Sequence, residues 1–229
     1  MTATGESTIR RGRPPVPDEP PAPQRFPGRG YRSAGSYFAA YAAAAATAAV
    51  SVDPVALDRA ASVLAEAYQG GATVFACGNG GSAAIANHMH CDHVKGIRTA
   101  TELSPRVVSL SSNVEMLTAV ANDIGYAEIF AYQLSAQARP GDVLVAISSS
   151  GRSPNIVQCL RWARAHRLRT IALTGFRGGE ARTLAEVSIH IDATNYGVVE
   201  DQHQAIMHSL AQYLRQAAMA ESAITASVF

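Results

Sequence analysis

The chain has 229 residues, of which 48% are hydrophobic, and this is enough for one α/β domain with a full core. Its 19 basic and 18 acidic residues leave a formal net charge of +1, which gives no electrostatic reason to expect a nucleic-acid or membrane partner. No apolar run reaches the roughly 20 residues that span a bilayer, no secretory signal is evident, and three cysteines without metal-site or disulfide spacing favour the cytoplasm.

The N-terminal residues 1–35 differ in composition from the rest of the chain. Seven of the eleven prolines lie between Pro14 and Pro27, among arginines, glycines and acidic residues. Such a segment cannot bury enough apolar surface to offset the entropy lost on ordering, so we expect a disordered tail. Two roles are open to it: a proline-rich recognition peptide, and a segment that packs along a neighbouring subunit.

Two helices are expected next. Residues 37–50 are rich in alanine, and Asp53 then caps a second helix with Pro54 at its first position. This helix runs to about Tyr68 and is stopped by two consecutive glycines. A long helical pair ahead of a sheet suggests an arm used in oligomerisation.

Apolar strands and helices alternate in the remainder of the chain. Strands are expected at residues 72–77, 106–110, 142–147, 168–173 and 187–191. Helices are expected at about residues 81–95, 113–121, 124–138, 153–166 and 199–218. Continuous apolar runs such as residues 143–147 indicate burial on both faces, and strands separated by helices are typical of βαβ units. The sequence therefore predicts an α/β fold with a parallel sheet, in one domain over residues 36–220 with a C-terminal tail at 221–229.

Two loops rich in glycine and serine follow the first and third of these strands. The first reads Cys-Gly-Asn-Gly-Gly-Ser over residues 77–82, and the second reads Ser-Ser-Ser-Gly-Arg-Ser-Pro-Asn over residues 148–155. Glycines let the backbone approach a ligand, serines add hydroxyl donors, and the helix behind each loop offers unpaired N–H groups. Together these features indicate a phosphate site for a small molecule. The first loop lacks the dinucleotide-binding spacing and the lysine of a P-loop.

A second set of polar residues lies on two of the predicted helices. His88 and Asp92 are four residues apart, and Glu200 and His208 are eight apart, so each pair shares a helix face. If the helices meet, two imidazoles and two carboxylates converge. Such a set can bind Zn²⁺ or a related divalent ion, and it can also act as an acid/base array without metal. Three other histidines on the same two helices are interpreted as structural residues: His90, His93 and His203.

Several segments match, in order, the pattern of one protein family. They are residues 77–82, 109–125, 139–142, 147–155, 173–175 with 178–179, and 200–208. In these segments the chain resembles the sugar isomerase (SIS) domain proteins, and among them the phosphoheptose isomerases, over about residues 37–218. The resemblance implies a doubly wound, five-stranded parallel sheet of the flavodoxin-like type, flanked by helices and preceded by a helical arm. It also implies an aldose–ketose isomerase that interconverts sedoheptulose 7-phosphate and an aldoheptose 7-phosphate.

The resemblance further implies roles for single residues. The serines of the two loops would hold the sugar phosphate: Ser82, Ser148, Ser149, Ser150 and Ser153. Asn79 and Gly80 lie where the family's first loop touches the sugar, and Asp123 matches the aspartate of its Asn-Asp-x-Gly turn. The metal and acid/base residues of the family match His88, Asp92, Glu200 and His208. Asp92 stands in place of the usual glutamate and Glu200 in place of glutamine, and the added negative charge favours a divalent cation.

For the reaction we expect Asp92 to act as base and His208 as acid, or the reverse with direction, through a cis-enediol. A Zn²⁺ held by all four residues would instead polarise the carbonyl and stabilise the enediolate. Two other functions stay open: a non-catalytic SIS regulator that binds a sugar phosphate, and an isomerase for another chain length such as an octulose phosphate. The family builds tetramers with active sites between subunits, so a cytoplasmic homotetramer is expected.

Overall fold

The structure is a computed structural model that describes residues 26–229. The sequence predicts a disordered tail at residues 1–35, and residues 1–25 of it lie outside the described residues. Within the rest of that segment, Phe26 packs against three tyrosine rings, with a centroid distance of 5.3 Å to Tyr37. The side-chain amide of Asn195 also donates to the Phe26 carbonyl at 3.1 Å. This segment is therefore attached to the body of the protein.

Five parallel strands form one sheet in the order β2-β1-β3-β4-β5. Their bounds are β1 (Thr73–Gly78), β2 (Arg106–Ser109), β3 (Val143–Ser148), β4 (Arg169–Thr174) and β5 (Val187–His190). This is the doubly wound, flavodoxin-like order, and its reversal point lies between β1 and β3. The predicted fold class is confirmed, and every predicted strand end agrees with the observed one to within one residue.

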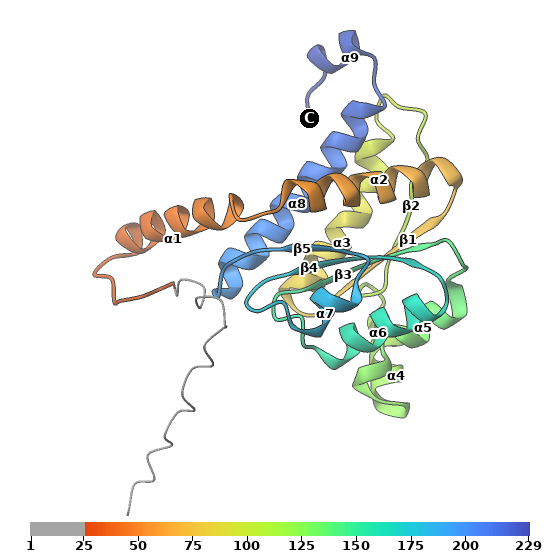
Figure 1. Cartoon of the computed structure of the whole chain (residues 1–229), viewed down its shortest axis with the longest axis horizontal. Helices are drawn as coiled ribbons and strands as arrows, with labels where there is room; N and C mark the ends of the chain where they lie inside the picture. The colour runs from red at the N-terminus through yellow and green to blue at the C-terminus, as the bar shows by residue number, and fades with distance from the viewer. Residues whose placement is uncertain (1–25) are drawn as a thin grey trace, which may run out of the picture.

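Helices cover both faces of the sheet (Figure 1). Their bounds are α1 (Ala34–Ala49), α2 (Pro54–Gly70), α3 (Gly81–Cys91), α4 (Val114–Asp123), α5 (Ala131–Gln137), α6 (Pro154–Ala165), α7 (Gly179–Leu184), α8 (Tyr196–Ala217) and α9 (Glu221–Thr225). One apolar core lies between the sheet and α2, α3 and α8, and a second lies between the sheet and α5, α6 and α7. Side chains alternate along β1, so that Val74 belongs to the first core and Phe75 to the second.

Several helices differ from the prediction. The helix predicted at residues 81–95 changes to a π-helical turn over Asp92–Ile97. The helix predicted at 124–138 is interrupted, because Gly125 adopts φ +146° and a 3-10 turn (Tyr126–Glu128) precedes α5. The prediction missed α7 and also α9, which lies inside the segment predicted as a C-terminal tail. Both are of six residues or fewer, too short to show a helical period in the sequence.

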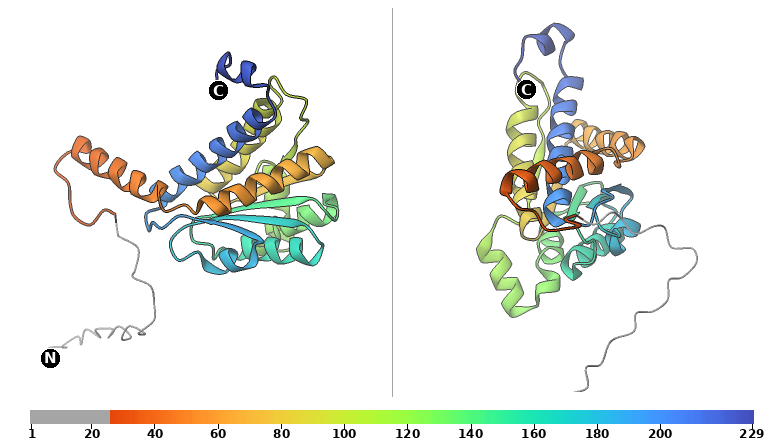
Figure 2. Two further views of the ribbon diagram at one scale, coloured as in Figure 1. Left: turned by 45° about the horizontal axis from the view of Figure 1, so that its top comes forward. Right: turned by 90° about the vertical axis from the view of Figure 1, so that its left-hand side faces the viewer.

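The helix α1 extends away from the body of the molecule (Figure 2). Ala48 is its one buried residue among those described, and Phe38 is 69% exposed. Tyr41 fastens α1 to α8, because its hydroxyl donates to Asp201 Oδ2 at 2.6 Å. Within the described part of the chain, no single helix has the length and apolar composition to cross a membrane. Only α1 and α2 taken together do, as a pair bent by 73°.

Candidate active site

The two glycine- and serine-rich loops meet at the carboxyl edge of the sheet. They follow β1 and β3, which are neighbours paired through Gly78 and Ile147, at the reversal point where ligands bind in doubly wound sheets. Between them lies a cavity of about 130 Å³. Its polar lining consists of Asn79, Ser82, Ser148, Ser149, Ser150, Ser153, Tyr196 and Glu200. The structure thus brings the predicted serines together, and it adds Tyr196, for which the sequence carried no signal.

The helices behind these loops begin without the side-chain caps found elsewhere. The helices α1, α2, α4 and α8 are each capped by a side chain, from Ser33, Asp53, Asn113 and Asn195 in turn. Within the described residues, no side chain caps α3, which begins after Gly80, or α6, which begins after Ser153. The buried hydroxyl of Ser149 likewise has no hydrogen-bond partner there. Free backbone and hydroxyl donors therefore gather around the cavity, as an anion would require.

Two glycines are needed for this shape. A Cβ on Gly81 would overlap the carboxyl group of Glu200, so glycine there leaves room for that carboxyl group beside the start of α3. Gly151 has φ +62°, and a Cβ there would overlap the Gly178 carbonyl. The amide of Ala181 donates to the Gly151 carbonyl at 3.0 Å. The start of α7 therefore packs against the second loop and hydrogen-bonds to it. This close contact is the structural role of the Gly178-Gly179 motif.

A cluster of three polar residues lies further along α3 and α8. His88 Nε2 is 3.1 Å from Asp92 Oδ1, and His208 Nδ1 is 2.7 Å from Asp92 Oδ2. The Gln204 amide nitrogen lies 2.8 Å from His208 Nε2 and donates to it, so the ring carries its proton on Nδ1 and donates it to Asp92. A carboxylate is thus held between two imidazoles that come from two helices.

This cluster has the donors of a metal site. The nearest ligand atoms of His88, Asp92 and His208 all lie within 4.8 Å of one another. Two imidazoles and a carboxylate are a common set for catalytic zinc, which leaves a coordination position open to water or substrate. The side chains of His88 and His208 are 48% and 40% exposed, so such a position is accessible. The residues present therefore fit a divalent ion.

Glu200 does not join this cluster, contrary to the sequence-based expectation. Eight residues of α-helix separate it from His208, a rise of about 12 Å. Its carboxyl group lines the serine cavity instead, beside Gly81. Burial, and secondarily the neighbouring Asp201, raise the pKa of Glu200 above its usual range. The prediction that Glu200 and His208 converge did not take this separation along the helix into account.

The remaining predicted residues are placed as follows. Asp123 ends α4, where its carboxylate accepts from Asn122 at 2.7 Å, and it does not line the serine cavity. His93 and His203 are fully buried, and desolvation lowers the pKa of each to about 4. His90 Nδ1 lies 2.7 Å from the Val107 carbonyl oxygen. None of these three histidines lines the serine cavity or belongs to the group formed by His88, Asp92 and His208.

A second cavity opens beside the cluster. It has a volume of about 420 Å³ and is lined by Asp92 and His208 together with Lys95, Gln212 and Arg215. Arg215 donates to the Val228 carbonyl at 3.1 Å and lies over the Phe229 ring, so the last residues form one wall. Within one chain, the serine cavity and the cluster therefore face two different spaces along the same pair of helices.

Comparison with known proteins agrees with this geometry. A family model described as SIS domain matches residues 37–175. The chain is 39% identical over 156 residues to the phosphoheptose isomerase of Rhodospirillum rubrum, covering 68% of this chain and 82% of that protein. It is similar in structure to the phosphoheptose isomerase of Francisella tularensis, with a TM-score of 0.71, 29% identity and coverage of 80% and 96%. The enzyme of Neisseria gonorrhoeae gives a TM-score of 0.70, 30% identity and coverage of 79% and 96%.

Proposed function

The chain belongs to the SIS domain family and, within it, to the phosphoheptose isomerases. From this premise we propose which role each site residue has in the reaction. It is a sugar-phosphate isomerase that interconverts sedoheptulose 7-phosphate and an aldoheptose 7-phosphate. The relatives do not favour a non-catalytic regulator or an octulose phosphate substrate. The catalytic domain spans residues 36–220.

The serine cavity binds the phosphate. Ser82, Ser148, Ser149, Ser150 and Ser153 supply hydroxyl groups, and the uncapped start of α3 supplies backbone N–H groups. Asn79 and Gly80 contact the sugar next to it, and Asp123 is the further residue assigned to substrate binding. A dianion here compensates for the missing caps and for the buried, unpartnered hydroxyl of Ser149. This set of unused donors is the observation that carries the proposal.

Asp92 and His208 move the protons. Starting from the ketose, the Asp92 carboxylate takes a proton from C1 while the protonated form of His208 gives one to the oxygen on C2. This forms the cis-enediol. Asp92 then returns its proton to C2 while His208 takes the proton of the C1 hydroxyl, which leaves the aldose and regenerates both groups. Proton transfer by positioned groups of this kind contributes about 10²–10⁴-fold to the rate.

A divalent ion, with zinc as the first candidate, is held by His88, Asp92 and His208. When bound, it supplies a Lewis acid that polarises the substrate carbonyl. A lone pair of Asp92 or His208 that binds the metal is not free to accept a proton. Metal content and proton transfer therefore have to be measured separately. Glu200 contributes to substrate binding from the serine cavity.

The protein works as a cytoplasmic homotetramer. The exposed face of α1 and the bulky side chains on it, such as Phe38, need a partner surface, and a second copy of the chain supplies one. The serine cavity and the cluster face different spaces in one chain, which supports active sites built from more than one subunit. In such an assembly the phosphate and the reacting carbons contact different chains.

Proton exchange tests the function directly. The protein is incubated with sedoheptulose 7-phosphate in D₂O, and deuterium at C1 and C2 is followed by NMR. An isomerase incorporates deuterium and produces the aldose. Tight binding of the sugar phosphate without any exchange would instead identify a sensor and overturn the proposal.

A further inference from the structure

Asn155 joins the two serine-bearing loops. It lies in the first turn of α6, and its side chain is fully buried. Its Nδ2 donates to Asn79 Oδ1 at 2.8 Å, and Asn79 Nδ2 donates to Asn155 Oδ1 at 2.9 Å. The two carboxamides thus form a reciprocal pair that links the loop after β1 to the start of the helix after β3.

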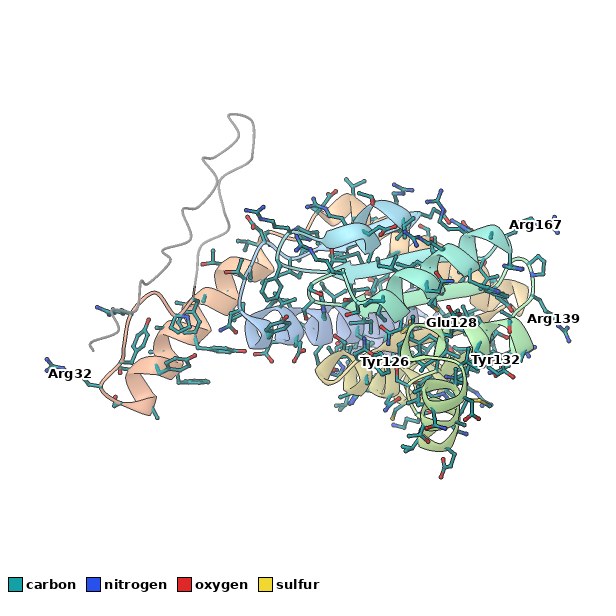
Figure 3. The ribbon with its side chains drawn as sticks, turned by 90° about the horizontal axis from the view of Figure 1, so that it is seen from below. Arg32, Tyr126, Glu128, Tyr132, Arg139 and Arg167 are labelled. Carbon is teal, nitrogen blue, oxygen red and sulfur yellow. The ribbon has the colours of Figure 1, made fainter. Side chains whose placement is uncertain are left out.

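A third segment meets the same pair. The Tyr126 hydroxyl donates to Asn79 Oδ1 at 3.0 Å, and the Ile156 amide donates to Asn155 Oδ1 at 3.0 Å. Tyr126 follows α4, and Figure 3 shows it where that helix joins the body of the protein. The oxygen of each carboxamide therefore accepts two hydrogen bonds, which fixes the orientation of both amide groups.

The pair matters because the phosphate donors come from two separate parts of the chain. Ser82 belongs to the first loop, whereas Ser148 to Ser153 belong to the second. Backbone pairing of β1 with β3 sets the distance between the loops as far as Gly78 and Ile147, and beyond those residues the pair of carboxamides joins them. A side chain that both donates and accepts is required for a reciprocal pair, and a buried carboxamide meets that need where a carboxylate or an apolar group would not.

We propose that Asn155 is a positioning residue for the phosphate cavity, which acts by holding Asn79 and the two loops at the spacing that a phosphate group requires. Asn155 is absent from the cavity lining, so it acts through Asn79, which does line the cavity. This inference rests on one part of the proposed function, namely that the serine cavity binds phosphate. It makes no use of the acid/base cluster, so it can be tested without turnover.

The test measures phosphate binding by calorimetry, with inorganic phosphate as the probe. Asn155→Ala and Asn155→Ser should each weaken binding about 10-fold, as expected when two net hydrogen bonds no longer hold the loops. The matched control is Val157→Ala, which truncates a buried apolar residue of the same helix that does not line the cavity. The control should lower the melting temperature and leave phosphate affinity unchanged. A purely structural role for Asn155 would give the same result as the control.

Two further measurements keep the proposal open to refutation. The Asn79→Ala and Asn155→Ala changes should be non-additive in a double-mutant cycle on phosphate affinity, because either one breaks the same pair. Tyr126 is 58% exposed, so the Tyr126→Phe variant should fold even if the Asn155 variants do not. It loses one hydrogen bond to Asn79 and should bind phosphate about twofold more weakly. Wild-type affinity in Tyr126→Phe and in every folded Asn155 variant overturns the proposal.

The outcomes also separate this inference from the proposed function. If the wild-type protein binds phosphate but does not isomerise sedoheptulose 7-phosphate, the proposed function fails and the role of Asn155 can still be measured. If it isomerises the sugar but the Asn155 variants bind phosphate normally, only the inference fails. If the wild-type protein isomerises the sugar but binds no phosphate, the inference about Asn155 fails and the isomerase function stands.

Discussion

His208 Nδ1 lies 2.7 Å from Asp92 Oδ2, where α8 passes the π-helical turn that follows α3. The two residues are 116 positions apart in the chain. Asp92 is the first residue of that turn, and π-helical segments are rare and often lie at functional sites. The contact between Asp92 and His208 thus depends on how α8 packs against this π-helical turn. The position of the phosphate cavity depends instead on the carboxyl edge of the sheet.

The first prediction concerns the Asp92 carboxylate. Asp92→Asn keeps the shape of the side chain but removes the base, so kcat should fall by about 10²–10⁴-fold with little change in phosphate affinity. Steady-state kinetics and deuterium exchange at C1 measure the effect. Asp92→Glu is the matched control, because it keeps the carboxylate, and it should retain more turnover than the amide. Wild-type turnover in Asp92→Asn would dismiss this residue as the base.

The second prediction concerns the close approach of α3 and α8. Gly81→Ala places a methyl group where the Glu200 carboxyl lies, so that side chain must turn away; the change should destabilise the protein by about 1 kcal/mol and weaken phosphate binding. Thermal unfolding and calorimetry test both effects. Gly35→Ala in α1 is the control, since a Cβ there meets no atom within 4 Å and it should be neutral or stabilising. Equal stability of the two variants would contradict the prediction.

Metal removal gives the third prediction. Dialysis against a chelator should lower isomerase activity, and added zinc should restore it. His88→Ala should reduce the zinc content of purified protein, measured by elemental analysis, because it removes one of three ligands. His166→Ala is the control, since His166 stacks on Trp162 away from the cluster. Full activity of protein verified to be free of metal would remove the ion from the mechanism.

The fourth prediction concerns pH and Glu200. Burial, with Asp201 in second place, raises the pKa of Glu200 in the folded state, so folding favours its protonated form. The resulting stabilisation is complete below the usual pKa of a glutamate, and it is lost as pH rises through the raised value. Glu200→Gln cannot ionise, so its melting temperature relative to wild type should increase as pH rises through that window. Glu115→Gln, on the first turn of α4, is the control. A pH-independent difference between Glu200→Gln and wild type would contradict the assignment.

Sharing of sites between subunits gives the fifth prediction. Ser149→Asp puts a negative charge into the phosphate cavity, and His208→Ala removes the acid, so each variant alone should be inactive. If a site takes its cavity from one chain and its cluster from another, mixing the two and allowing subunits to exchange should restore part of the activity. Analytical ultracentrifugation checks that a tetramer forms. A mixture no more active than its parents, although exchange is verified, would place each site within one chain.

The sequence by itself determined the sheet and the phosphate loops. Apolar runs such as residues 143–147, separated by helices, are buried on both faces, and glycines and serines at the strand ends leave donors that a ligand must use. These properties follow from neighbours along the chain, so local patterns carry them. The pairing of His88 with Asp92 is likewise a matter of helical spacing.

Only the tertiary structure decided which side chains meet across elements. It put Glu200 in the serine cavity rather than with His208, because the rise of a helix separates residues that share one face. It also revealed the reciprocal pair of Asn79 and Asn155, which lie 76 residues apart. Such contacts depend on the packing of α3, α6 and α8 on a common sheet, and the spacing within any one segment carries no information about that packing.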